Sequence, residues 1–376
     1  HQYLYMGGEM MTRREQEILE IIKEKPTIEQ SELAAMLGIT RSSVAVHIAN
    51  LQKKGYILGR GYIVNNGDYI VGIGAANVDV HGRSKKAINL HDSNPGHMNT
   101  SAGGVTRNVS ENFARLGGNV KLITAVGDDV YADKICAECT AAGIDISHIL
   151  KVDNHPSSTY ISVLDEKGDM FVALSDMSVL QKMDVEFLHS KGNIIKGSRL
   201  IMCDPGLPVD IIEEILNLYS DTVPVFVDTV SQAYAAKLVD LIGKFHTAKP
   251  NLMETEILSG MKINDRKDLY KACEKILDKG LNRIFVSLGA DGCLYMDRDG
   301  RRIERKLKPV ENMINATGAG DAFMAAVIYS YINDFSLEKT IDYGLAAGIA
   351  AISHERTINP NMSISLLENI LKERKK

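Results

Sequence analysis

The chain has 376 residues, of which 45% are hydrophobic and 24% are charged, and its formal net charge is −5. The composition is that of a globular protein, and the length suits two domains better than one. No apolar run approaches the roughly 20 residues of a membrane-spanning helix, and the first ten residues lack the pattern of a secretion signal. The five cysteines are scattered and complete no zinc site. We therefore expect a cytoplasmic protein with no membrane partner.

Residues 10–64 predict a small, mainly helical domain. Thr12 and Glu15 form a capping box at the start of a helix over 12–25. Ser31 is expected to cap a second helix and Thr40 a third. The whole order is helix, helix, turn, helix and β-hairpin, with helices over residues 12–25, 31–38 and 40–55 and hairpin strands over 56–58 and 62–64. This pattern resembles a winged helix-turn-helix domain, and the polar segment 65–68 marks the boundary to a second domain over 68–376.

The second domain alternates strand-like and helix-like segments. Strands are expected at 69–74, 121–126, 199–203, 223–228 and 283–287, and helices at 105–116, 129–142, 208–219 and 266–279. Such alternation predicts an α/β fold with a doubly wound, mostly parallel sheet. Segments from about 79–102 and 158–175 break the alternation with short β-like runs, which predict a small β lid. Two long helices are expected within 319–353.

A run of small residues leads into an apolar helix at Thr317-Gly318-Ala319-Gly320-Asp321. Glycines allow close approach to the backbone, and the free N–H groups of a first helical turn bind anions. A carboxylate beside an anion site is useful if the anion is a transferring phosphoryl group and Asp321 accepts the proton of the attacking hydroxyl. The alternative is an ordinary glycine-rich helix start with an acidic first turn.

This run resembles the signature of the ribokinase-like (PfkB) carbohydrate kinases, and further motifs occur in the family's order. The resemblance implies Asp321 as the catalytic base and Gly318, Ala319 and Gly320 as the anion hole. It implies a substrate pocket formed by Asp79, Gly103, Gly104 and Asn108. It also implies an ATP site with Asn251, Ser287, Gly289, Gly292 and Thr317, and Mg²⁺ placed by Glu254 and Asn251 through water.

Two residues depart from the family pattern, because Asn315 stands where most members have Asp and Ala316 where they have Thr. No GxxxxGK[ST] motif occurs in the sequence, which excludes a P-loop kinase. The resemblance implies ATP and Mg²⁺ as cofactors, and it allows a monovalent cation such as K⁺.

Within the family, the chain resembles bacterial pseudouridine kinases in segments 91–96, 170–177 and 356–361. This likeness implies phosphorylation of the 5′-hydroxyl of pseudouridine. Asn94 and Asp176, both on the predicted lid, are candidates for contacts with the base, and the alternative for each is a turn residue. Another sugar or nucleoside kinase remains an alternative. So does a transcription regulator that uses the kinase-like domain as a ligand sensor.

The N-terminal domain carries candidate DNA-binding residues on its third helix. Residues 10–64 hold eight basic and six acidic side chains, whereas residues 65–376 hold 35 basic and 41 acidic ones. In a helix-turn-helix, the second helix of the pair enters the major groove. We predict contacts from Arg41, Ser42, Ser43, His47 and Arg60, and the alternative is a docking module that binds no DNA. A homodimer is also expected.

Overall fold

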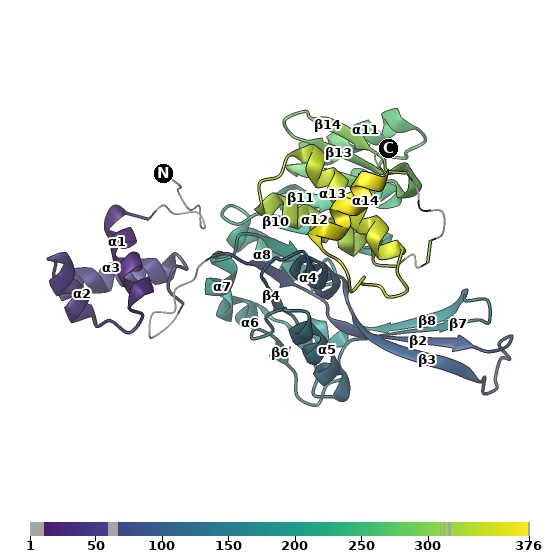
Figure 1. Ribbon diagram of the computed structural model, residues 1–376, viewed down its shortest axis with the longest axis horizontal. Helices are drawn as coiled ribbons and strands as arrows, with labels where there is room; N and C mark the ends of the chain where they lie inside the picture. Colours follow the sequence, from purple (N-terminus) through teal and green to yellow (C-terminus); the bar gives the residue numbers. More distant parts are fainter. Residues whose placement is uncertain (1–10, 59–66, 309, 311–312, 315–316, 375–376) are drawn as a thin grey trace.

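The computed structural model describes residues 11–58, 67–308, 310, 313–314 and 317–374. Its N-terminal part contains the expected helices α1 (Arg13–Glu24), α2 (Gln30–Leu37) and α3 (Arg41–Lys53) (Figure 1). The capping box of Thr12 and Glu15 is confirmed, and so is the Thr40 cap of α3. These helices bury an apolar core of their own that includes Ile18, Leu33, Val44 and Leu51.

The predicted Ser31 cap of α2 is wrong. The helix begins at Gln30, and Glu29 holds the extended N-cap position. The Ser31 hydroxyl donates a hydrogen bond to the Glu29 carboxylate at 3.2 Å instead of accepting one from the backbone. The second strand of the expected hairpin, and Arg60 with it, lies outside the described residues.

The main sheet has eight strands in the order β14-β13-β12-β11-β10-β9-β1-β4. The six strands from β4 to β12 in this order are parallel, and β13 and β14 continue the sheet antiparallel. The bounds are β1 (Ile70–Ile73), β4 (Val120–Ile123), β9 (Ile201–Cys203), β10 (Val225–Asp228), β11 (Thr247–Lys249), β12 (Arg283–Ser287), β13 (Cys293–Asp297) and β14 (Arg302–Arg305). This confirms the doubly wound, mostly parallel α/β fold.

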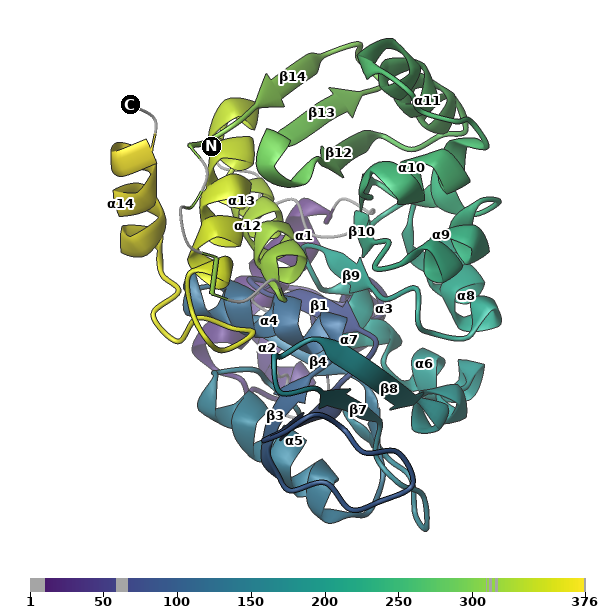
Figure 2. The same ribbon diagram turned by 90° about the vertical axis from the view of Figure 1, so that its right-hand side faces the viewer.

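Helices cover both faces of this sheet because its strands are apolar on both sides. On β10, Val225 and Val227 pack into one core while Phe226 packs into the other. One face is covered by η1 (Ser178–Lys182), α6 (Val185–Ser190), α7 (Gly192–Lys196), α8 (Val209–Tyr219), α9 (Gln232–Leu238), η2 (Ile242–Lys244), α10 (Leu252–Ser259) and α11 (Arg266–Asp278). The other face carries α4 (Val105–Arg115), α5 (Val130–Ala141), α12 (Ala319–Ile332) and α13 (Leu337–Ile352), with α14 (Ile364–Arg374) packed outside α13 (Figure 2).

A four-stranded sheet of order β3-β2-β7-β8 projects from the body as the predicted lid (Figure 1). Its strands are β2 (Asn77–Ser84), β3 (Gly96–Gly103), β7 (Thr159–Leu164) and β8 (Met170–Asp176). At its base the lid buries Val78 and Val80 in the core that also includes residues of α5. Its outer strand is exposed, with Leu174 at 69% and Met170 at 61%.

Two sequence expectations about strands need correction. The predicted strand 121–126 is two strands, since β4 ends at Ile123 and β5 (Ala125–Val126) pairs with β6 (Leu150–Lys151) instead. Strands β11, β13 and β14 were missed. The three residues of β11 are too few to show the alternation of polar and apolar residues that marks a strand. Strands β13 and β14 are separated only by a short turn, and no pattern marked them as two strands. In the part of the chain that the structure covers, no helix is long and apolar enough to cross a membrane.

Candidate active site

Helix α12 begins at the edge of the sheet where the parallel strands end. Its N-cap, Gly318, has a φ of 84°, and a Cβ there would lie 2.2 Å from the carbonyl oxygen of Thr357. Only glycine fits this left-handed, crowded position without strain. Ala319 and Gly320 form the first turn with Asp321, so the predicted anion-hole residues lie together at a helix N-terminus.

The neighbouring strand ends supply further charged side chains to the same place. Asp204 follows β9, Asp228 ends β10, and Lys249 ends β11. The Nζ atom of Lys249 lies 2.9 Å from a carboxylate oxygen of Asp228, and both side chains are almost fully buried. A Cβ on Gly320 would lie 3.2 Å from the Lys249 Nζ, so α12 starts directly against this ion pair.

Lys249 was missed as a site residue. Burial lowers the pKa of its ammonium, but the carboxylates of Asp228, Asp321 and Glu254 outweigh burial, and the pKa is raised. A permanent cation thus lies beside the helix start, where a transferring phosphoryl group needs positive charge. Lys249 ends β11, a strand of three residues that the sequence did not predict, so its position at the sheet edge where ligands bind became visible only in the structure.

Asp321 is a half-buried carboxylate whose environment suits a general base. Burial raises its pKa to about 7, and the negative charge of Asp228 adds to this effect. A hydrogen bond from Asn108 Nδ2 at 2.9 Å and the charge of Lys249 act in the opposite direction. A carboxylate with a pKa near neutral pH accepts a proton more readily than an ordinary aspartate does.

Asp79 lies at the base of the lid, where β2 leaves the body. It accepts a hydrogen bond from Asn77 Nδ2 at 2.6 Å, and burial raises its pKa. A Cβ on Gly103 would lie 2.2 Å from an Asp79 oxygen, and one on Gly104 would lie 2.5 Å from the carbonyl oxygen of Ala75. Gly103 therefore permits the close packing of β3 against the Asp79 carboxylate, and Gly104 permits the start of α4 to approach the backbone of Ala75.

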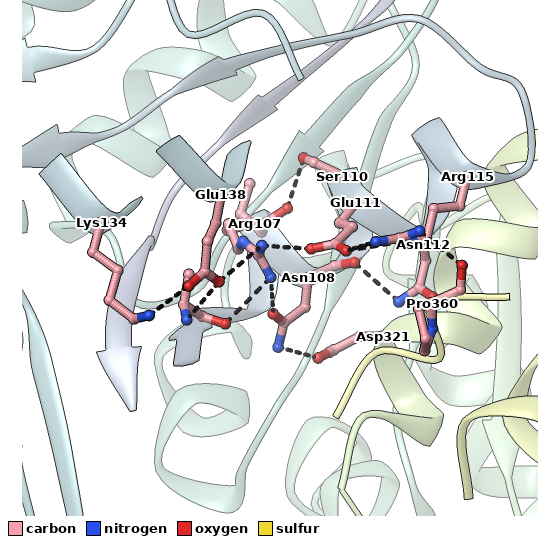
Figure 3. Close-up of polar contacts among 12 residues, drawn as sticks. Arg107, Asn108, Ser110, Glu111, Asn112, Arg115, Lys134, Glu138, Asp321 and Pro360 are labelled. Carbon is pink, nitrogen blue, oxygen red and sulfur yellow. Dashed lines mark hydrogen bonds and ion pairs between the residues drawn. The ribbon is translucent and has the colours of Figure 1, made fainter. Parts of the chain in front are cut away.

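Asn108, predicted to contact the substrate, donates a hydrogen bond to Asp321 in this structure (Figure 3). It lies in the first turn of α4, beside a buried guanidinium, that of Arg107, which is only 3% exposed. Arg107 was given no role in the sequence analysis, because a single sequence gives no sign that an arginine is buried. The site that the structure builds is thus a junction of α4 with α12.

Four of the five predicted ATP-site residues lie in a second region. Asn251 caps α10 through a reciprocal capping box with Glu254, and an isolated bridge joins it to Ser287 at the end of β12. Asn251, Ser287 and Gly289 line a cavity of about 470 Å³. Gly289 and Gly292 have φ values of 58° and 88° around the short helix η3 (Gly289–Asp291). Thr317 is exposed just before α12.

The residues proposed to place Mg²⁺ fit only an indirect role. Both Glu254 oxygens already accept hydrogen bonds, from the Asn251 backbone and side-chain nitrogens at 2.9 Å and from the Thr229 hydroxyl at 2.5 Å. Among the described residues, no group of three or more His, Cys, Asp and Glu could hold a metal ion. Magnesium retains several waters and is commonly held by one or two carboxylates and by substrate phosphates. The expected placement through water is compatible with these contacts.

Two lid residues predicted to contact the base do not join Asp79. Asn94 closes an exposed loop by bonding to Asn89 and to the carbonyl oxygen of Asp92. Asp176 lies opposite Thr159 in the strand register, whereas Asp79 lies opposite Tyr160, so the two aspartates belong to opposite faces of the lid. Asp176 accepts a hydrogen bond from the backbone of Ser178. Both contact patterns are those of turn residues.

On α3, Arg41 and Ser42 are exposed in the first turn, while Ser43 and His47 are half-buried. The His47 Nδ1 atom is buried without a hydrogen-bond partner among the described residues. Lys54, a basic residue that directly follows α3, pairs with the buried Glu15 at 2.9 Å. The available positive charge on this face is therefore carried by fewer residues than the sequence indicated.

A small-molecule kinase is the class of protein that this arrangement defines, because a helix start suited to anions carries a carboxylate base and lies beside a buried cation. Residues 68–364 match the pfkB family of carbohydrate kinases, and the chain belongs to this family. Residues 11–57 match a winged helix-turn-helix DNA-binding family.

Relatives extend this assignment over nearly the whole chain. The chain is 36% identical to the pseudouridine kinase of Escherichia coli K12 over 80% of this chain and 97% of that protein. It is 32% identical to the uncharacterized sugar kinase YeiI of the same organism over 94% of this chain and 97% of YeiI. A crystal structure described as that of a "putative sugar kinase" from Clostridium perfringens aligns with a TM-score of 0.74 and 34% identity, covering 82% of this chain and 97% of that one.

Proposed function

We propose that the chain transfers the γ-phosphoryl group of ATP to the 5′-hydroxyl of pseudouridine. The observation that carries this proposal is Asp321, half-buried at the first turn of α12 and held by Asn108 beside the cation of Lys249. In the reaction, the hydroxyl oxygen attacks the γ-phosphorus, its proton passes to Asp321, and ADP leaves. The N–H groups of Ala319 and Gly320 face the charge that develops on the phosphoryl oxygens.

The nucleotide is assigned to the cavity beside Asn251 and Ser287. Its volume of about 470 Å³ is in the range of small-molecule sites. A ribokinase-fold structure from E. coli, with a TM-score of 0.71, is described as a complex with ATP and Mg²⁺. When bound, Mg²⁺ neutralises the phosphate charge, and Glu254 and Asn251 would orient its waters. A monovalent cation such as K⁺ is part of the same proposal.

The inner face of the lid favours a nucleoside over a simple sugar. The next residue of β2 on the face of Asp79 is His81, whose Nδ1 lies 2.6 Å from the Ser162 hydroxyl. Asn99 lies opposite His81 in the register. Beyond the carboxylate assigned to the ribose, the lid thus carries a row of donors and acceptors that a uracil ring can satisfy.

An acceptor panel tests the proposal. ATP turnover by the intact chain is measured with pseudouridine, uridine and ribose at matched concentrations, with and without K⁺. We expect pseudouridine to have the highest kcat/KM, because its second ring N–H has no counterpart in uridine. Equal values for pseudouridine and uridine would replace the substrate with a broader class of nucleoside. Turnover of ribose alone would make the chain a sugar kinase, and no turnover would favour a ligand sensor.

We also propose that the N-terminal domain binds DNA through α3. The exposed Arg41 and Ser42 at the start of this helix support it, together with the match to a DNA-binding family. Arg41→Ala is expected to weaken specific binding by about 1–3 kcal/mol without changing kinase activity. Fragments selected from the genome should contain an inverted repeat if the chain is a homodimer. Failure of the intact chain to retain any fragment at low salt, with or without pseudouridine, would leave a protein-docking role.

A further inference from the structure

Arg107 lies at the junction of α4 with the lid and has contacts on three sides (Figure 3). Its Nη1 atom donates to the carbonyl oxygen of Ala102 at 3.2 Å and to Asn108 Oδ1 at 3.4 Å. Its Nη2 atom pairs with Glu111 and lies 3.9 Å from Glu138. The guanidinium therefore bridges the end of strand β3 and the residue that contacts Asp321.

These contacts determine how the Asn108 amide is oriented. Arginine donates hydrogen bonds and accepts none, so the amide oxygen of Asn108 must face Arg107. The amide nitrogen then faces Asp321, to which it donates at 2.9 Å. The opposite orientation would set the amide NH₂ against a cation and the amide oxygen against a carboxylate. Arg107 thus holds the amide N–H donor of Asn108 toward Asp321 without contacting Asp321 itself.

Arg107 also reaches the acceptor side of the site. Ala102, which it holds, precedes Gly103, the residue in close contact with the Asp79 carboxylate. Burial raises the pKa of Asp79, and the positive charge of Arg107 acts against that rise. The same side chain therefore influences the carboxylate assigned to the ribose and, through Asn108, the carboxylate assigned to catalysis.

The cluster around Arg107 is not optimised for stability. The Nε atom of Arg107 is buried without a partner within the described ranges, and leaving a buried donor unsatisfied is costly. Glu111 is shared with Arg115 at 2.6 Å, and Glu138 with Lys134 at 2.6 Å. Buried ion networks are often no more stable than apolar packing of equal volume. Since Arg107 gains little stability from this burial, we infer that its position serves to orient the groups that it contacts.

We propose that Arg107 is a positioning residue for phosphoryl transfer, which orients the Asn108 amide toward Asp321 and ties this contact to lid strand β3. The inference rests on the proposed role of Asp321 as the base. Other charged groups also face Asp321, namely Asp204, Asp228 and Lys249, and the substitutions below leave all of them in place.

The test compares Arg107→Lys with Lys134→Met in the intact chain, with pseudouridine as acceptor. Lys has one nitrogen in place of Nη1 and Nη2, so it cannot occupy both the position that pairs with Glu111 and the position that donates to Ala102 and Asn108. The value of kcat should therefore fall about 10-fold to 100-fold. The acid limb of the kcat profile should move to higher pH, because Asp321 loses an ordered donor. Lys134→Met removes a positive charge from the same cluster without touching Asn108. It should leave kcat and the pH profile unchanged.

A double-mutant cycle separates positioning from folding. In an Asn108→Ala background, Arg107→Lys should lower kcat no further, since its route to Asp321 is already absent. Additive losses would overturn the proposal, as would wild-type kcat and pH profile in Arg107→Lys alone. Asp321→Asn is measured alongside. Near-normal turnover in that variant would mean that the proposed base, and not the Arg107 relay, is wrong.

Discussion

The α4–α12 junction and the lid both carry candidate site residues, but they are built in opposite ways. At the junction, Arg107 and Asn108 are 3% and 6% exposed, and hydrogen bonds fix their orientation. On the outer lid strand, Phe171 is 51% and Leu174 is 69% exposed. Groups that must act on a developing charge gain from being fixed in advance, whereas groups that select a ligand can lie on an exposed, replaceable surface. We therefore expect changes at the junction to alter kcat, and changes on the lid to alter KM and selectivity.

The largest expected effect lies at the junction. Asp321→Asn keeps the size of the side chain and removes the base, so kcat should fall about 10²-fold to 10⁴-fold. ATP binding, measured by calorimetry, should remain close to that of the unmodified chain. Turnover within a few-fold of normal would show that the junction is not where the chemistry takes place.

The base of the lid should behave differently. Asp79→Ala removes charged hydrogen bonds to the ribose, each worth about 1.5–3 kcal/mol, and should raise KM for the acceptor about 10-fold or more. KM for ATP should change little, because Asn251 and Ser287 line a separate cavity. An effect confined to ATP would mean that the two pockets are assigned the wrong way round.

A stability measurement sharpens the comparison without substrates. Burial raises the pKa of Asp321 to about 7 in the folded chain, above the ordinary value of 3.8. The folded state therefore holds a proton that the unfolded state has lost, so this group's contribution to stability falls as pH rises from about 4 to 7. Asp321→Asn should be more stable than the unmodified chain at pH 8, by about 1–2 kcal/mol in urea unfolding, and no more stable near pH 4. A difference that does not depend on pH would contradict the account of this carboxylate.

The smallest expected effect lies further out on the lid. Asn99→Ala should lower the preference for pseudouridine over uridine by about fivefold, as expected for loss of one neutral hydrogen bond. Leu90→Ala, at an exposed position in the lid loop, serves as the control and should leave the preference unchanged. Loss of kcat in Asn99→Ala, with the preference intact, would mean that the lid contributes to chemistry after all.

Most of the fold could be predicted from the sequence because the residues that start and end its helices act over short distances along the chain. Thr12 with Glu15, and Gly318 before α12, act within one helical turn, and both positions agree with the structure. Strand β11 was missed because three residues carry no period. The N-cap of α2 is Glu29 and not Ser31, because the Ser31 hydroxyl bonds to the Glu29 carboxylate. The pattern of residue types along the sequence does not reveal this choice of partner.

The candidate site was less predictable where residues act through contacts distant in sequence. Asn108 and Asp321 are 213 positions apart, and no local pattern joins them. Asp176 lies on the opposite face of the lid from Asp79, and the sequence did not reveal this because a one-residue difference in register decides which face a strand residue occupies. The role of Arg107 follows only from its burial between Ala102 and Asn108.

Phosphorus NMR of the reaction products tests the central claim most directly. The intact chain is incubated with ATP, Mg²⁺ and pseudouridine, and the fate of the γ-phosphoryl group is followed. The account predicts ADP and a phosphomonoester on the 5′ oxygen of pseudouridine in equal amounts, with almost none formed by Asp321→Asn. Release of inorganic phosphate without a phosphorylated nucleoside, or an unchanged spectrum with tightly bound pseudouridine, would contradict it.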